Sequence, residues 1–178
     1  TAIPEMTVKS PRVHRPSIMH LFAVACYLLL AIAFTHPLLL NATDHIANKP
    51  AGDQLWQASI LETQYHVVFS DPGRLFETNF YFGSGSALYA SDLLIGFLPL
   101  FAPLRLASGN PILAFNLTWI LAFFFNATAM YFAVAHITRN RSAGMLAGTI
   151  YAFAPIALNL TSAHLQLAGA WWIPMTLY

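Results

Sequence analysis

Carboxylates, the side chains best suited to proton transfer and cation binding, are concentrated in one stretch of this 178-residue chain. Six of the seven acidic residues lie within residues 41–92, and none follows that stretch. The six are Asp44, Asp53, Glu62, Asp71, Glu77 and Asp92. Chemistry that uses a carboxylate as a general base or a cation ligand is therefore expected in this polar segment.

Asp53 is the strongest candidate for a catalytic base. It follows a Pro-Ala-Gly break at residues 50–52 and opens residues 53–69, which contain neither glycine nor proline and have a helix-compatible composition. At about 100° per residue, Asp53, Gln57 and Gln64 share a narrow stripe beside an apolar one. The pattern predicts a helix along the membrane face whose polar stripe is turned to a cavity. The position of Asp53 also suits a helix N-cap, and the two roles are compatible.

The other acidic residues have weaker claims to chemistry. Asp44 is the second catalytic candidate, although its neighbour in sequence, His45, is not expected to face the same site. Asp71 precedes Pro-Gly and is predicted to be a turn residue, and Asp92 is predicted to cap the helix that follows it. The two glutamates of the segment are expected to be solvated or to pair with Arg74.

The histidines leave two further kinds of site open. Three of them lie in or at the ends of apolar runs, where a ring nitrogen could ligate haem or a chlorin, although polar residues there more often bond to another helix. These three are His20, His36 and His136. Another three, His45, His66 and His164, could hold a metal only if the fold brought them together, which their spacing does not indicate. The sequence identifies no cofactor and no metal site.

The composition indicates an integral membrane protein. Charged residues make up 8% of the chain and hydrophobic residues 57%, whereas soluble domains carry about 25% charged residues. The net charge of +1 and the absence of a basic stripe with interleaved aromatics give no reason to expect nucleic acid as a partner.

The apolar runs predict an all-α, polytopic bundle of about four or five transmembrane spans. Residues 1–17 form a basic tail, which the positive-inside rule places in the cytoplasm, and residues 18–178 form a single transmembrane domain. The expected spans are residues 18–40, 93–107, 111–137, 143–160 and an incomplete 167–178, with residues 41–92 as an outer loop that carries the interfacial helix. A bacterial inner membrane protein with its N-terminus in the cytoplasm would have this arrangement.

The second of these spans leaves the topology open. Residues 93–107 are short for a span and carry two prolines one turn apart. If they cross fully, Arg105 lies inside while Arg139 and Arg141 lie outside, against the positive-inside rule. If they are re-entrant, the two later arginines lie inside and Arg105 does not. The sequence permits either arrangement.

A stripe of small residues is expected to bring two helices close together. Gly144, Gly148 and Ala152 are spaced four residues apart within an apolar run. Small residues at this spacing allow helix backbones to approach closely in membranes.

Short motifs follow one another in a recognisable order along the chain. They are Thr35-His36-Pro37-Leu38, Gly52-Asp53 with Trp56, Asp71-Pro72-Gly73, Asn79-Phe80-Tyr81-Phe82, Ser91-Asp92, Gly109-Asn110-Pro111, Phe115-Asn116-Leu117, Thr138-Arg139-Asn140-Arg141, Tyr151-Ala152-Phe153-Ala154-Pro155, His164-Leu165-Gln166-Leu167 and Trp172-Ile173-Pro174. This series resembles the N-terminal part of bacterial membrane proteins of the GT-C glycosyltransferase superfamily, which are related to the dolichyl-phosphate-mannose-dependent mannosyltransferases. The resemblance lies in the order of the motifs rather than in any one of them.

The resemblance implies that the donor is a sugar on a polyprenyl phosphate and that an aspartate of the first outer loop is catalytic. On that pattern Asp53 would deprotonate the acceptor hydroxyl, with Asp44 as the second candidate. Arg74 could offset the charge of the donor phosphate, and Gln57 and His164 are the other candidate substrate-binding residues. The expected partners are membrane lipid, the lipid-linked donor and other membrane subunits. The alternative hypothesis is a non-catalytic accessory subunit of a larger respiratory or photosynthetic complex.

Overall fold

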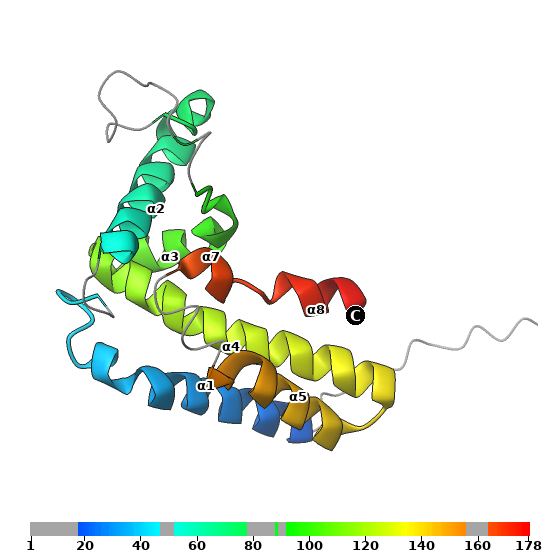
Figure 1. Ribbon diagram of the computed structural model, residues 1–178. Coiled ribbons are helices and arrows are strands. Elements are labelled where there is room, and N and C mark those ends of the chain that lie inside the picture. The colour runs from blue at the N-terminus through cyan, green and yellow to red at the C-terminus, as the bar shows by residue number, and fades with distance from the viewer. Residues whose placement is uncertain (1–17, 47–51, 78–87, 89–91, 156–163) are drawn as a thin grey trace, which may run out of the picture.

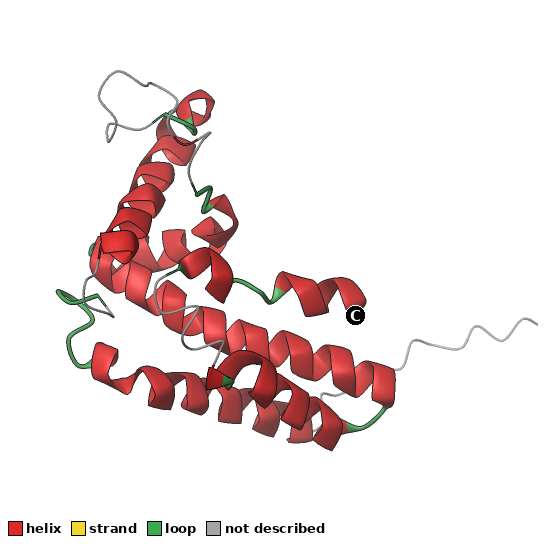
Figure 2. Ribbon diagram, in the orientation of Figure 1, coloured by secondary structure: helices red, strands yellow, loops and turns green. Residues whose placement is uncertain are grey.

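A computed structural model describes residues 18–46, 52–77, 88, 92–155 and 164–178, and all regular structure in these ranges is helical (Figures 1 and 2). The helices are α1 (Ile18–Leu39), α2 (Gly52–Ser70), the short 3-10 helices η1 (Pro72–Arg74) and η3 (Ile95–Phe97), α3 (Leu98–Ser108), α4 (Pro111–Thr138), α5 (Arg141–Phe153), α7 (Leu165–Ala168) and α8 (Trp172–Leu177). The predicted all-α class is confirmed.

Helices α1 and α4 are long and apolar enough to cross a membrane, and they are the two such helices in the described part of the chain. They contain 22 and 28 residues, which at about 1.5 Å per residue exceeds a hydrocarbon core of roughly 30 Å. The predicted spans at 18–40 and 111–137 therefore match α1 and α4 closely. A bundle of four or five spans is not confirmed.

The two long helices run antiparallel, side by side (Figure 1). Near the start of α4, the Asn116 amide donates hydrogen bonds to the backbone carbonyls of Ala42 and His45, just beyond the end of α1. Near the opposite ends, His20 Nδ1 and the Tyr131 hydroxyl are 2.7 Å apart and hydrogen-bonded. The beginning of α1 therefore lies beside the end of α4.

Helix α5 packs against α4 as closely as its glycine stripe predicts. A Cβ atom at Gly144 would lie 2.7 Å from the Tyr131 carbonyl oxygen. At Gly148 it would lie 2.5 Å from both the Ala127 carbonyl oxygen and the Tyr27 hydroxyl. Only residues without a side chain fit at these two points, so the stripe brings α5 onto α4 and α1.

The apolar run at 93–107 forms η3 and α3, a shorter apolar helical segment than α1 or α4. Helix α3 has 11 residues, or about 16 Å, roughly half of a hydrocarbon core. It ends at Gly109, whose φ of 67° allows the chain to turn directly into α4. The side chain of Asn110 then caps α4 by accepting hydrogen bonds from the backbone N–H groups of Ile112 and Leu113.

The last two predicted spans are seen in part. The run at 143–160 corresponds to α5, while residues 156–160 lie outside the described residues. In place of one helix over 167–178, the structure has two short ones, α7 and α8. They are separated at Gly169, where a Cβ atom would overlap the ring of Phe97.

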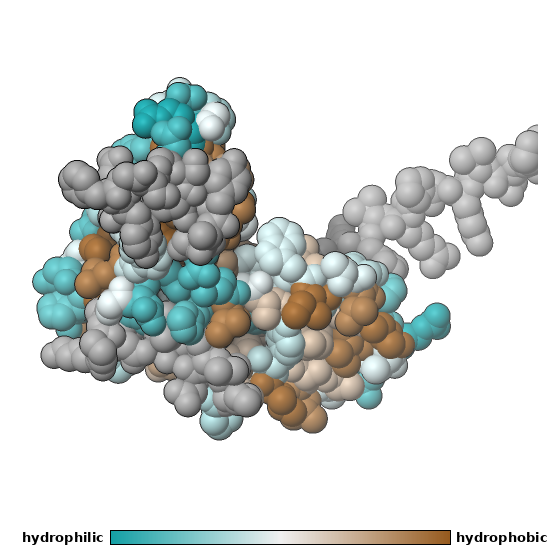
Figure 3. Space-filling view, turned by 45° about the horizontal axis from the view of Figure 1, so that its top comes forward, coloured by the Kyte–Doolittle hydropathy of each residue, from teal (hydrophilic) through white to brown (hydrophobic). Residues whose placement is uncertain are grey.

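Helix α2 lies across the end of the long helices rather than along them (Figure 1). Its inward face contributes Ala58, Ile60 and Leu61 to a buried core that also contains Phe101 and Phe115. A second core lies where α1, α4 and α5 meet. Figure 3 shows hydrophilic residues gathered at the end of the molecule that carries α2 and hydrophobic residues toward the opposite end, where α8 lies.

Candidate functional site

The described carboxylates lie at one end of the molecule, on α2 and on the segments flanking it. Asp44 is in the loop that Asn116 holds against the start of α4, and Asp53 is in the first turn of α2. At the other end, the Arg141 guanidinium lies 3.6 Å from the Met19 sulfur. The polar segment and the basic turn after α4 are thus at opposite ends of the two long helices.

Asp53 is an exposed residue within the first turn of α2. The helix begins at Gly52, so the carboxylate lies where the helix dipole favours a negative charge. Among the described residues Asp53 makes no hydrogen bond or ion pair, and its predicted partner on the same stripe, Gln57, is turned inward. Its carboxylate is accessible to a ligand that approaches from solvent. Its catalytic role stays a prediction.

Asp44 forms an ion pair with its neighbour in sequence, His45. Its Oδ1 lies 3.1 Å from His45 Nδ1, contrary to the expectation that the two side chains would not share a site. The hydrogen bond from His45 holds the pKa of the Asp44 carboxyl below its ordinary value. A carboxylate with a lowered pKa is a weaker base, so the pairing with His45 disfavours Asp44 for proton abstraction.

The structure brings Gln57 and the His164 segment together. Gln57 is buried, and its Oε1 accepts a 2.7 Å hydrogen bond from the backbone N–H of Leu165, the first residue of α7. Its Nε2 donates to Gln166 Oε1 at 2.9 Å. His164 is the residue before α7, and its Nδ1 is buried without a hydrogen-bond partner among the described residues.

Asp92 completes this network instead of capping a helix. The predicted cap position is taken by Leu94, which precedes η3. The Asp92 carboxylate accepts a 3.1 Å hydrogen bond from Gln166 Nε2. We call Gln57, Asp92, His164, Leu165 and Gln166 the α7 junction.

Helix α7 depends on other helices for its backbone partners because it has only four residues. Gln57 accepts from its first N–H group, and the Asn126 amide of α4 donates to its last carbonyl, that of Ala168, at 2.7 Å. The Tyr151 hydroxyl of α5 donates to the carbonyl of Ala170 at 2.8 Å. The α7 junction therefore has a fixed position relative to α2, α4 and α5.

Arg74 lies apart from this network. It is exposed, and its Nε donates to Glu77 Oε2 at 2.6 Å. Pairing with Arg74 is one of the two alternatives predicted for the glutamates. Arg74 follows the Asp71 turn after α2, where the Asp71 carbonyl accepts from the Arg74 N–H. The proposed role of Arg74 toward a donor phosphate stays a prediction.

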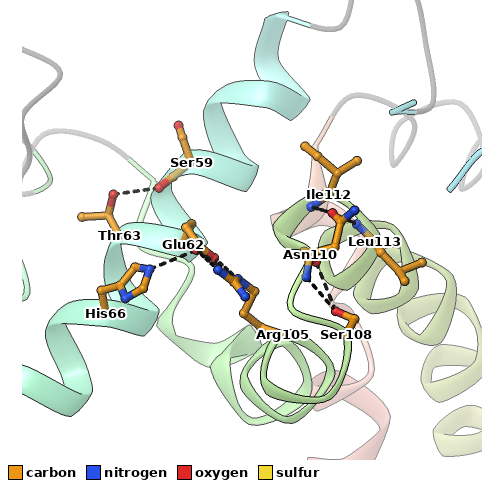
Figure 4. Close-up of polar contacts among 9 residues, drawn as sticks. All are labelled: Ser59, Glu62, Thr63, His66, Arg105, Ser108, Asn110, Ile112 and Leu113. Atoms are coloured by element: carbon orange, nitrogen blue, oxygen red, sulfur yellow. Dashed lines mark hydrogen bonds and ion pairs between the residues drawn. The ribbon is translucent and has the colours of Figure 1, made fainter. Parts of the chain in front are cut away.

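The sequence did not predict the strongest ion pair of the region, which joins α2 to α3 (Figure 4). The guanidinium of Arg105 donates to both oxygens of Glu62, with distances of 2.7 to 3.0 Å. His66, one turn later on α2, hydrogen-bonds the same carboxylate at 3.0 Å. Burial would raise the pKa of Glu62, but the bonds from Arg105 and His66 outweigh it, so the pKa lies below its ordinary value. Glu62 is a structural anion rather than a base.

The inward face of α2 carries buried amides. Gln54, Gln57 and Gln64 are at most 4% exposed. Among the described residues, the amide nitrogen and oxygen of Gln64 have no hydrogen-bond partner. The predicted polar stripe therefore turns inward at its two glutamines, whereas Asp53 stays at the surface.

No group of three or more histidines, cysteines, aspartates or glutamates is close enough to hold a metal ion within the described ranges. His45 pairs with Asp44, and His66 pairs with Glu62. His164 belongs to the α7 junction, so the fold does not gather these three histidines.

Comparison with protein-family models, with curated proteins and with solved structures finds no match for this chain. The resemblance to the GT-C superfamily therefore rests on the order of the short sequence motifs alone.

Proposed function

We propose that this chain is part of a membrane glycosyltransferase that transfers a sugar from a polyprenyl-phosphate donor to an acceptor hydroxyl. The observation that carries the proposal is the exposed carboxylate of Asp53, one helical turn before Gln57 of the α7 junction. The α7 junction supplies amide and carboxylate groups that donate and accept hydrogen bonds. Such groups suit the hydroxyls of a sugar.

A membrane location is supported by the surface of the long helices. Apolar side chains are exposed along α1, where water would disfavour them and lipid would not. They include Ile18, Leu21, Phe22, Leu29 and Phe34. Helix α2, which lies across the end of these helices, suits the interfacial position that its composition predicts.

The antiparallel course of α1 and α4 supports a cytoplasmic N-terminus. Arg139 and Arg141 lie at the end where α1 begins, while Arg105 lies beside α2 at the other end. These positions favour the re-entrant alternative for residues 93–107, in which the arginines would agree with the positive-inside rule. Asp53 would then face the outer side of a bacterial inner membrane.

In the proposed reaction Asp53 acts as the general base. Its carboxylate takes the proton of the acceptor hydroxyl while the oxygen bonds to the anomeric carbon of the donor sugar. The bond between that carbon and the phosphate oxygen breaks, and polyprenyl phosphate leaves with the electron pair. General-base catalysis of this kind contributes about 10²- to 10⁴-fold to a rate.

The test is transfer activity of the complete protein with a polyprenyl-phosphate sugar donor after the substitution Asp53→Asn. We expect kcat to fall by at least about 100-fold because amide nitrogen and oxygen cannot take the proton. Asp71→Asn is the matched control, because Asp71 is an exposed carboxylate in a turn outside the α7 junction. Equal activity of both variants and the unmodified protein would rule out Asp53 as the base.

The second candidate function is a non-catalytic subunit of a larger membrane complex. Exposed apolar residues on α5 and α8 favour it, because another subunit would cover them as well as lipid would. They are Leu146, Ile150, Trp172 and Ile173. Purification in a mild detergent distinguishes the two functions: a stoichiometric partner with haem or chlorin absorbance bands supports the subunit, and a colourless, active protein supports the enzyme.

A further inference from the structure

We propose that the basic end of the molecule binds an anionic phospholipid, with its phosphate beside Arg139 and Arg141 and an acyl chain between α4 and α8. This site lies at the end opposite the α7 junction. The proposal does not depend on glycosyl transfer.

A cavity of about 580 Å³ marks the polar half of the site. Its lining includes His20 from α1, His136 from α4, Arg139 from the turn after α4, and Arg141, the first residue of α5. The Tyr131 hydroxyl hydrogen-bonds Nδ1 of His20 at 2.7 Å, which orients that ring at the cavity wall. Two histidines and two arginines thus converge from three helices and the turn after α4.

These positive charges are not neutralised within the described part of the chain. Neither Arg139 nor Arg141 pairs with a carboxylate there, and the sequence has no acidic residue after Asp92. An anion bound at this end would gain their attraction without displacing an existing ion pair. Guanidinium groups donate in a planar fork that matches phosphate oxygens.

A second cavity, of about 400 Å³, extends the site along the helices. Phe125 and Ala129 of α4 form one of its walls, and Trp171 and Met175 form the facing one. Phe132 and Tyr178 line both cavities, so the apolar groove adjoins the basic cavity.

The basic cavity and the adjoining apolar groove together indicate the chemistry of the ligand. Free phosphate would occupy the basic cavity and leave the groove uncovered, whereas an uncharged hydrocarbon would leave the arginines without a partner. An anionic phospholipid satisfies both parts at once. A basic pocket between helices, next to an apolar groove, suits such a headgroup and its acyl chain.

Tryptophan quenching tests the proposal on the complete protein in mixed micelles. In a Trp172→Phe background, which removes the exposed neighbouring tryptophan, phosphatidylglycerol brominated on its acyl chains should quench tryptophan fluorescence because a chain in the groove contacts Trp171. The further substitution Trp171→Phe should lose most of that quenching. Brominated phosphatidylcholine should bind at least about tenfold more weakly. The double variant R139Q/R141Q should bind both lipids equally, while R139K/R141K, which keeps the charge, should still prefer phosphatidylglycerol.

The groove is tested separately with Ala129→Leu, which should weaken quenching by both lipids. Equal quenching of the Trp172→Phe protein by the two lipids, or none by either, would overturn the proposal. It would also be overturned if millimolar inorganic phosphate displaced phosphatidylglycerol and Ala129→Leu had no effect, because the site would then hold free phosphate. The variant R139K/R141K retains both positive charges. If it lost the preference for phosphatidylglycerol just as R139Q/R141Q does, positive charge would not explain that preference and the proposal would be overturned.

Discussion

The guanidinium of Arg105 and the carboxylate of Glu62, 43 residues apart in sequence, form a forked ion pair between α3 and α2. Both side chains are about four-fifths buried, with 19% and 22% of their surfaces exposed. The face of the Tyr65 ring lies 5.8 Å from the Arg105 guanidinium carbon, on the same helix as Glu62. This pair attaches the transverse helix α2 to the short helix α3, and so helps to position the α7 junction.

The Glu62–Arg105 pair should contribute measurably to stability. We expect Glu62→Gln to lower the free energy of unfolding by about 1–3 kcal/mol, because hydrogen bonds to a charged group are lost within a partly buried site. The measurement is thermal or denaturant unfolding of the detergent-solubilised protein. The exposed pair Arg74–Glu77 is the control, and Glu77→Gln should cost less than about 1 kcal/mol. Equal effects of the two substitutions would show that the partly buried pair has no special role.

The same pair predicts how stability depends on pH. The pKa of Glu62 in the folded protein lies below its usual 4.5 because the bonds from Arg105 and His66 outweigh the effect of burial. A lowered pKa stabilises the fold above the unfolded-state pKa, and this contribution is lost as pH falls through the folded-state pKa. We therefore expect the Tm difference between the unmodified protein and Glu62→Gln to be constant near neutral pH and to shrink below about pH 4.5. A difference that grew on acidification would contradict the assignment.

The long helices could be predicted from sequence because the length and hydrophobicity of one continuous run are enough to identify each of them. Residues 18–40 and 111–137 are apolar runs of sufficient length, and α1 and α4 follow them within about one residue. The run at 93–107 is ambiguous from sequence because its short length and two prolines permit either a full crossing or a re-entrant course. Its course depends on Phe97, which stacks edge-on against Trp171 at 5.3 Å between ring centroids, and no local pattern shows such a contact.

The α7 junction could not be predicted for the same reason. Gln57 was placed on a polar stripe facing a cavity, but its actual partners lie more than 100 residues later in the chain. Burying a glutamine amide without a hydrogen-bond partner would cost about 1–3 kcal/mol. The burial of Gln57 could therefore be predicted only if its partners were already known. Asp92 looked like a helix cap from its neighbours, yet its carboxylate binds Gln166.

Loss of the Gln57 side-chain amide should loosen α7. We expect Gln57→Leu to leave the Leu165 N–H without its partner and to destabilise the docking of α7 by about 1–3 kcal/mol. Hydrogen exchange of the Leu165 amide, followed by mass spectrometry of the peptide that contains it, measures this effect directly. Gln57→Glu retains an acceptor for that N–H, so the amide should remain protected even though the donor to Gln166 is lost. Equal exchange rates in both variants would contradict the role assigned to Gln57.

The contact between α5 and α4 should be intolerant of even one methyl group. In the structure a Cβ at Gly148 would lie 2.5 Å from a backbone carbonyl oxygen, which cannot move aside without displacing α4. We expect Gly148→Ala to lower the stability of the detergent-solubilised protein by about 1–3 kcal/mol, as overpacking of a close contact does. Gly96→Ala is the matched control, because a Cβ at Gly96 would have no atom within 4 Å. The helix propensity of alanine favours both substitutions, so any excess loss at Gly148 measures the steric contact alone. If the two variants unfolded at the same temperature, α5 would not approach α4 as closely as the structure shows.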